Sequence, residues 1–334
     1  MVSNSAMACL YEKNVASRLH LVSVFCISLV VSGFAELQRF QHAIKDDGSL
    51  SFLVVGDWAE EGSITNPQLL YRQMGRIGEQ LDIDFVVSTG DNFYGDGLRD
   101  VNDPAFLESF KDIYTATSLQ KQWYSVLGNH DYRGDTEAQL SPALRRIDSR
   151  WLCQRSFILN TGIAEFFFVD TTPFVNKYLV DKENNYDWRA VSPDLKVALN
   201  KSTAKWKIVV GHHAIRSVGH HGDTPELISL LLPTLKAHNV DMYMNGHDHC
   251  LEHISSLDRK HVSSDSVFNK RAGSKAWRGD VKSYKNNRAM KFFYDGQGFM
   301  SVKLTGSDAK IAFYDVLGRL LHTWKMSKPL HSTM

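Results

Sequence analysis

The sequence predicts an α/β fold in which several buried strands end at polar residues suited to binding metal. Short apolar and β-branched runs alternate with stretches whose apolar residues recur at helical spacing. Five of the runs stop at a glycine beside Asp, Asn or His, and strand-like runs separated by tight turns fill the C-terminal part. The composition, 43% hydrophobic and 22% charged over 334 residues, is that of an ordinary globular protein.

The N-terminal segment differs from the rest of the chain. An apolar run from Leu19 to Val31 follows Lys13 and Arg18 and precedes the small residues Gly33 and Ala35. This order is typical of a signal peptide, so we expect cleavage after Ala35 and export. The alternative is an uncleaved signal anchor, but the run is short for a membrane span.

Cleavage would leave residues 36–334, in which we find no domain boundary and expect a single domain. Export would take the protein to the extracellular space or the vacuole, and it would make Asn200-Lys201-Ser202 a glycosylation sequon. The cysteines left, Cys153 and Cys250, are expected either to form one disulfide or to stay as buried thiols. A net charge of +1 predicts no nucleic-acid or stable membrane partner, and we expect a monomer.

The first half of the mature chain is predicted to consist of strands followed by helices. Asn66 is a plausible helix N-cap and Pro67 suits the first helical position. The expected strands are 51–55, 84–89 and 123–127, and the expected helices are 67–80 and 104–113.

The second half continues this pattern and then changes. Thr224-Pro225 opens an apolar helix that we expect to reach Lys236 with a kink at Pro233. Residues 257–291 are polar with little periodicity, which predicts loops. The expected strands are 165–170, 207–210 and 241–244, followed by antiparallel strands at 299–304, 310–314 and 320–324.

The polar residues at five strand ends are the candidate metal ligands. In open α/β sheets ligands bind at the carboxyl ends of the strands, so these side chains are expected to converge on one crevice. They are Asp57, Asp91 with Tyr94, Asn129 with His130, His212, and His247 with His249.

The types of these ligands indicate the metals. Oxygen and imidazole ligands without a thiolate suit iron, manganese or zinc, and the phenol of Tyr94 favours ferric iron. The set is too large for one ion and suits two ions that share a carboxylate, for which Asp91 is the natural bridge.

These motifs together resemble the purple acid phosphatases of the calcineurin-like metallophosphoesterases, and among them the low-molecular-weight plant enzymes. The resemblance implies a four-layer α/β/β/α sandwich with a C-terminal antiparallel region. The motifs that carry it are Gly56-Asp57, Gly90-Asp91-Asn92-Phe93-Tyr94, Gly128-Asn129-His130-Asp131, Val209-Val210-Gly211-His212 and Gly246-His247-Asp248-His249.

The resemblance also implies a reaction and a role for each candidate residue. The enzyme would hydrolyse small phosphate monoesters in acid, by attack of a metal-held hydroxide at a centre of Fe(III) and a divalent Fe, Zn or Mn ion. His130 and His221 would bind phosphate and supply the general acid, with a histidine of an ordinary surface loop as the alternative for His221. His213 and His220 are expected to be structural or solvated. The implied ligands are Asp57, Tyr94 and His249 for Fe(III), and Asn129, His212 and His247 for the divalent ion, with Asp91 bridging.

The chain departs from the family pattern at three places. Ala59 stands where the family usually has Gly, the segment between Trp188 and Ala204 looks shorter than in relatives, and residues 258–272 lack the usual strand and Gly-rich loop. Two alternatives to an active phosphatase stay open, and the departures give rise to the first of them. One is a catalytically impaired metal-binding homologue, and the other is a phosphatase with additional peroxidase-like redox activity.

Overall fold

The computed structural model of the chain describes residues 37–58, 67–178, 188–255, 265–268 and 289–329. The described residues from Leu37 onward belong to one compact unit. The predicted signal peptide, the departure at Ala59 and the predicted cap at Asn66 lie outside the described residues, so they stay predictions.

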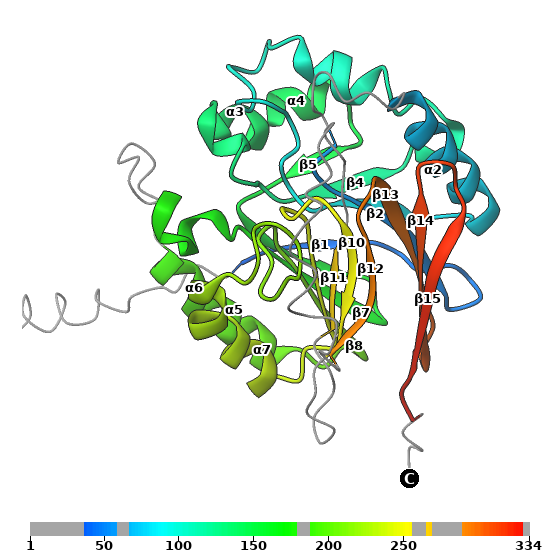
Figure 1. Cartoon of the computed structure of the whole chain (residues 1–334), viewed down its shortest axis with the longest axis vertical. Helices are drawn as coiled ribbons and strands as arrows, with labels where there is room; N and C mark the ends of the chain where they lie inside the picture. The colour runs from blue at the N-terminus through cyan, green and yellow to red at the C-terminus, as the bar shows by residue number, and fades with distance from the viewer. Residues whose placement is uncertain (1–36, 59–66, 179–187, 256–264, 269–288, 330–334) are drawn as a thin grey trace, which may run out of the picture. The chain divides into compact units, whose positions relative to one another are not determined.

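Two mixed β-sheets form the centre of this unit (Figure 1). The first sheet has seven strands in the order β15-β14-β13-β2-β3-β4-β5, and the second has eight in the order β1-β6-β7-β8-β9-β11-β10-β12. In the first sheet the bounds are β2 Leu50–Val55, β3 Phe85–Ser88, β4 Gln122–Ser125, β5 Trp151–Cys153, β13 Gly298–Leu304, β14 Asp308–Asp315 and β15 Leu320–Ser327. In the second they are β1 Gln38–Gln41, β6 Ser156–Asn160, β7 Ala164–Val169, β8 Trp206–Val210, β9 Met242–Asn245, β10 Leu251–Ile254, β11 Asp265–Phe268 and β12 Met290–Tyr294.

The central strands are apolar throughout because both of their faces are buried. In β2, Phe52 and Val54 pack in the core between the two sheets, while Leu53 and Val55 pack on the opposite face. The second sheet contributes Phe166 and Ile208 to the same inter-sheet core.

Helices cover the outer face of each sheet. On the seven-stranded sheet, Leu70, Met74 and Ile77 of α2 pack against Leu53 and its neighbours. On the eight-stranded sheet, helices α5, α6 and α7 pack on residues of β7, β8 and β9 (Figure 1). This arrangement confirms the predicted α/β/β/α sandwich with an antiparallel C-terminal region, formed by β13, β14 and β15.

The helices agree with the prediction in part. The expected helix is interrupted at Leu231, between α6 and α7, and Pro233 lies in the first turn of α7, close to the expected kink. The predicted helix over 104–113 contains a π-helical segment. The α-helices are α2 Pro67–Leu81, α3 Thr136–Leu140, α4 Pro142–Ile147, α5 Trp188–Lys201, α6 Pro225–Leu230 and α7 Leu232–Ala237. The π-helix is η1 Leu107–Lys111, and the 3₁₀ helices are η2 Thr117–Leu119, η3 Asp131–Arg133, η4 Thr172–Phe174 and η5 Asn176–Tyr178.

The prediction of loops over 257–291 was wrong in part. Strand β11 lies within this range, pairs parallel to β9 and antiparallel to β10, and fills the position between them. Apolar and polar residues do not alternate along β11, so its extended form depends on pairing with the strands on both sides. The segment expected to be short, between Trp188 and Ala204, contains the 14-residue helix α5.

Cys153 and Cys250 are both buried and unpaired. Of the two sequence alternatives, the structure therefore has the free thiols. Burial raises the pKa of both thiols well above their ordinary value, which keeps them protonated and unreactive.

Candidate metal centre

The predicted ligands come together where the parallel strands of both sheets end. Parallel β2, β3 and β4 lead to Asp57, Asp91 and Asn129, and parallel β7, β8 and β9 bring His212 and His247 to the same place. The backbone at this junction is strained, because Asp57, Asp91 and His247 have positive φ values of 54°, 49° and 76°. Such strain persists where the surrounding structure holds a functional residue in place.

One group of ligands surrounds the phenol of Tyr94, and we call it the Tyr94 half. The Tyr94 hydroxyl lies 3.1 Å from Asp57 Oδ1, 2.9 Å from Asp91 Oδ2 and 3.0 Å from His249 Nε2. His249 Nε2 lies 3.5 Å from Asp57 Oδ1. The three ligands that the resemblance assigns to the ferric ion are therefore in mutual contact.

The second group surrounds the imidazole of His212, and we call it the His212 half. His212 Nε2 lies 3.2 Å from Asn129 Oδ1 and 3.2 Å from His247 Nδ1. Its other nitrogen, Nδ1, lies 3.0 Å from the carbonyl oxygen of Thr89. When His212 is neutral, donation from Nδ1–H to that carbonyl leaves the Nε2 lone pair directed at Asn129 and His247, as metal-binding histidines require.

One carboxylate oxygen joins the two halves. Asp91 Oδ2 lies 2.9 Å from the Tyr94 hydroxyl and 3.4 Å from His212 Nε2. The other oxygen, Oδ1, accepts a hydrogen bond of 2.7 Å from the backbone N–H of His130. Because Oδ1 is held by this bond, Oδ2 is fixed between the two halves.

The spacing and charge of these atoms fit two cations. Ligand atoms that share one ion at 2.0–2.2 Å lie about 3 Å apart, as they do in both halves. Burial, together with the charges of Asp57 and Asp91, raises the pKa of the Tyr94 phenol well above its ordinary value. The phenol can therefore ionise here only beside a strongly acidic cation.

The protonation of the ligands in the metal-free protein also indicates that this centre needs positive charge. Burial alone would lower the pKa of His212, but the Asp91 charge and hydrogen bond outweigh it and raise the pKa to about 9. Burial lowers the pKa of His247 well below its ordinary value, so this ring is a neutral ligand. In the metal-free protein the His212 proton partly balances the carboxylates.

Two glycines permit the close approach of the ligand loops. A Cβ at Gly128 would lie 2.3 Å from Asp91 Oδ1, and a Cβ at Gly246 would lie 2.4 Å from Asp57 Oδ2. The backbone N–H of His247 donates to the Asp57 carboxylate at 3.1 Å. A residue with a side chain at either glycine would collide with a carboxylate oxygen. Glycine is therefore needed at both positions for the ligand loops of the two sheets to pack this closely.

Asp131 supports the loops that carry the ligands, a role that the sequence motifs did not predict. Its buried carboxylate accepts hydrogen bonds from the backbone N–H groups of Asn92, Phe93 and Gly128 and from the side-chain amide of Gln139. It therefore ties the loop after β3 to the loop after β4. The sequence signal available for it was its place at the end of the Gly-Asn-His-Asp motif.

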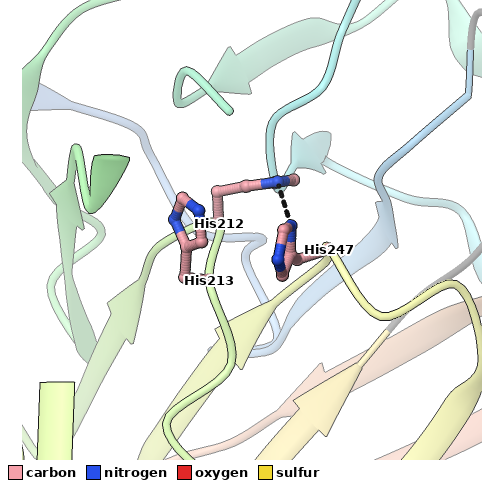
Figure 2. A group of neighbouring side chains, drawn as sticks. All are labelled: His212, His213 and His247. Atoms are coloured by element: carbon pink, nitrogen blue, oxygen red, sulfur yellow. Dashed lines mark hydrogen bonds between the residues drawn. The ribbon is translucent and has the colours of Figure 1, made fainter. Parts of the chain in front are cut away.

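The two predicted catalytic histidines lie on either side of the centre. The His130 ring packs 4.3 Å from the Tyr94 ring between centroids, and the His221 ring stacks on His247 at 4.2 Å. Figure 2 shows His212, His213 and His247 as neighbouring side chains. His213 is buried, whereas His220 is exposed and packs beside His221.

A buried carboxyl holds the loop that carries His221. Glu252 in β10 accepts hydrogen bonds from the Val218 N–H at 2.9 Å and from the Ser217 hydroxyl at 3.1 Å. Burial raises the pKa of Glu252 to about 8, and the nearby charges of Asp248 and Asp223 act in the same direction. The folded chain thus keeps a proton on Glu252 over a pH range in which the unfolded chain releases it.

We expect this proton to make the fold more stable in acid. The unfolded carboxyl ionises near 4.5 and the folded one near 8, so Glu252 lowers the free energy of unfolding by up to about 1.4 kcal/mol per pH unit as pH rises through this window. Glu252→Gln mimics the protonated acid, so it should match the parent in acid and exceed it near neutrality. Urea unfolding of metal-free protein across this range measures the effect, with the exposed Glu79→Gln as control. Parallel stability curves for parent and Glu252→Gln would refute it.

Comparison with known proteins identifies the family. Residues 50–251 match the calcineurin-like phosphoesterase family. Purple acid phosphatase 17 of Arabidopsis thaliana is 57% identical over 332 residues, which cover 96% of each chain. The chain belongs to the purple acid phosphatases. The resemblance seen in the motifs is thus confirmed along nearly the whole chain.

More distant relatives also match over most of this chain. Tartrate-resistant acid phosphatase type 5 of Homo sapiens is 28% identical over 84% of this chain and 91% of that protein. Among solved structures, GAP50, the anchor in the inner membrane complex of Plasmodium, matches with a TM-score of 0.69 and 26% identity over 85% of this chain and 90% of that one. Among the described residues, none of the helices has the length and apolar character needed to cross a membrane.

Proposed function

We propose that this protein is an acid phosphatase that hydrolyses small phosphate monoesters at a dinuclear Fe(III) and divalent metal centre. The observation that carries the proposal is the position of Asp91 Oδ2, 2.9 Å from the Tyr94 hydroxyl and 3.4 Å from His212 Nε2. Membership of the purple acid phosphatases supports the same assignment.

The two halves would hold the two ions. Asp57, Tyr94 and His249 offer the hard oxygens and the imidazole that suit Fe(III), and Asn129, His212 and His247 offer the neutral donors that suit divalent Fe, Zn or Mn. When bound, such a pair neutralises phosphate charge and lowers the pKa of water enough to supply hydroxide in acid.

The remaining residues would orient the ester and give a proton to its leaving group. His130 and His221 lie next to ligands of opposite halves, so a phosphate group over the centre would contact both rings. The leaving alkoxide must gain a proton as its bond to phosphorus breaks, and one of these two histidines would donate it as the general acid. Glu252 and Asp248 fix the His221 loop, since His221 N–H donates to Asp248 Oδ1 at 2.6 Å.

The test is to express residues 36–334, measure metal content, and assay an aryl phosphate at mildly acid pH. We expect two metal ions per chain, at least one of them iron, and turnover that falls as pH rises above neutral. Metal at this stoichiometry without turnover would overturn the proposal.

The second candidate is a metal-binding homologue without catalytic activity. We keep this candidate because the chain matches GAP50, a protein of the same fold that is described as an anchor and not as an enzyme. The same assay separates the two candidates. The assembled ligand set favours the active enzyme.

We also propose export through the secretory pathway, with glycosylation at Asn200. This residue is exposed in the last turn of α5, where an oligosaccharide would meet solvent. Expression in a eukaryotic secretion system should give a secreted protein whose mobility increases after endoglycosidase treatment. Asn200→Gln should migrate like the treated protein, and a parent protein retained in cells or insensitive to the enzyme would contradict the proposal.

A further inference from the structure

The hydrogen bonds of Thr171 fix the tautomer of His213. Thr171 Oγ1 accepts the backbone N–H groups of His212 at 3.1 Å and His213 at 3.0 Å, and it lies 3.1 Å from His213 Nδ1. A hydroxyl has two acceptor sites and one proton to donate. Because both acceptor sites are used, Thr171 O–H donates to Nδ1, and the proton of the neutral imidazole sits on Nε2.

This Nε2–H is a buried donor without an acceptor among the described residues. His213 is 1% exposed, and its Nε2 makes no hydrogen bond there. Because Nδ1 accepts the Thr171 hydroxyl proton, the ring carries a single proton and is neutral. A buried donor without a partner costs on the order of 1–3 kcal/mol, so an acceptor is expected when the protein functions.

The ring lies beside the His212 half. One ring nitrogen from each of His212, His213 and His247 lies within 4.8 Å of the others (Figure 2). The His213 ring centroid is 4.5 Å from that of His247 and 4.9 Å from that of His212. Three imidazoles at this spacing could form a metal site, but the tautomer leaves His213 no free lone pair to offer.

We propose that His213 donates a hydrogen bond from Nε2 to an oxygen of the phosphate group held at the His212 half. This proposal rests on the proposed function and adds a phosphate-binding residue to it. The donor is held by Thr171 before phosphate arrives, so it needs no rearrangement to bind. A hydrogen bond from a buried donor to a charged oxygen corresponds to roughly 10- to 100-fold in affinity.

The tautomer can be tested without metal or turnover. Long-range ¹H–¹⁵N NMR of metal-free protein should show His213 with its proton on Nε2 and a bare Nδ1. The signal is assigned by its loss in His213→Leu. A proton on Nδ1 would overturn the proposal, whatever the activity of the enzyme.

Phosphate affinity tests the role itself. For metal-loaded protein, calorimetric titration with inorganic phosphate should give a Kd that rises about 10- to 100-fold in His213→Leu, with metal content unchanged. His213→Gln, which returns an amide N–H, should recover part of the affinity, and the distant His238→Leu should leave it unaltered. Loss of metal in His213→Leu, or unchanged phosphate affinity with metal retained, would overturn the proposal. A parent protein that holds two metals but binds no phosphate would contradict the proposed function itself.

Discussion

Asp91→Asn is expected to lower kcat/KM for an aryl phosphate by at least about 10³-fold, because the loss of bridging charge removes several kcal/mol of stabilisation. The amide cannot supply a charged oxygen to both the Tyr94 half and the His212 half. Its oxygen can still accept the hydrogen bond from His130 N–H that now reaches Asp91 Oδ1 at 2.7 Å. The fold should therefore survive while the metal content falls.

The measurement pairs steady-state kinetics with metal analysis of the same preparation. Asp96→Asn is the matched control, because Asp96 lies in the same loop but is exposed and forms a surface ion pair with Arg133. It should keep both metals and nearly all activity. If Asp91→Asn retained two metals and more than a tenth of the activity, the bridging role would be wrong.

Asp131→Ala is expected to destabilise the protein by about 3–5 kcal/mol, because it leaves several buried N–H groups without an acceptor. Three of these donors are the backbone N–H groups of Asn92, Phe93 and Gly128, which lie in the two loops that carry Asp91 and Asn129. Because the loops would separate, metal affinity should fall as well.

Urea unfolding of metal-free protein measures this effect apart from metal binding. Asp96→Ala, at an exposed position, serves as the control and should change the free energy of unfolding by less than about 0.5 kcal/mol. A loss below about 1 kcal/mol in Asp131→Ala would show that water replaces the carboxylate, and the support assigned to Asp131 would be wrong.

The strand ends could be predicted from sequence because each is a local pattern. An apolar run followed by Gly and a ligand residue marks both the strand and its carboxyl end, and parallel pairing then brings Asp57 and Asp91 together. In the outer layers, helical periodicity identified α2, and the apolar run opened by Thr224-Pro225 identified the region of α6 and α7.

The features that the sequence did not predict depend on contacts between distant segments. Strand β11 is extended because β9 and β10 flank it, and β1 because it pairs with β6. The tautomer of His213 depends on Thr171, 42 residues away in the chain. Nor could the pattern distinguish the two oxygens of Asp91, although their different partners define the bridge.

The most direct test of the central claim is anomalous diffraction from crystals of the metal-loaded protein, with data collected on both sides of the iron absorption edge. We predict two metal peaks, one on each side of Asp91 Oδ2, with an iron signal next to Tyr94 and His249. A single peak, or iron on the His212 side with nothing bound at Tyr94, would contradict the proposed two-metal centre.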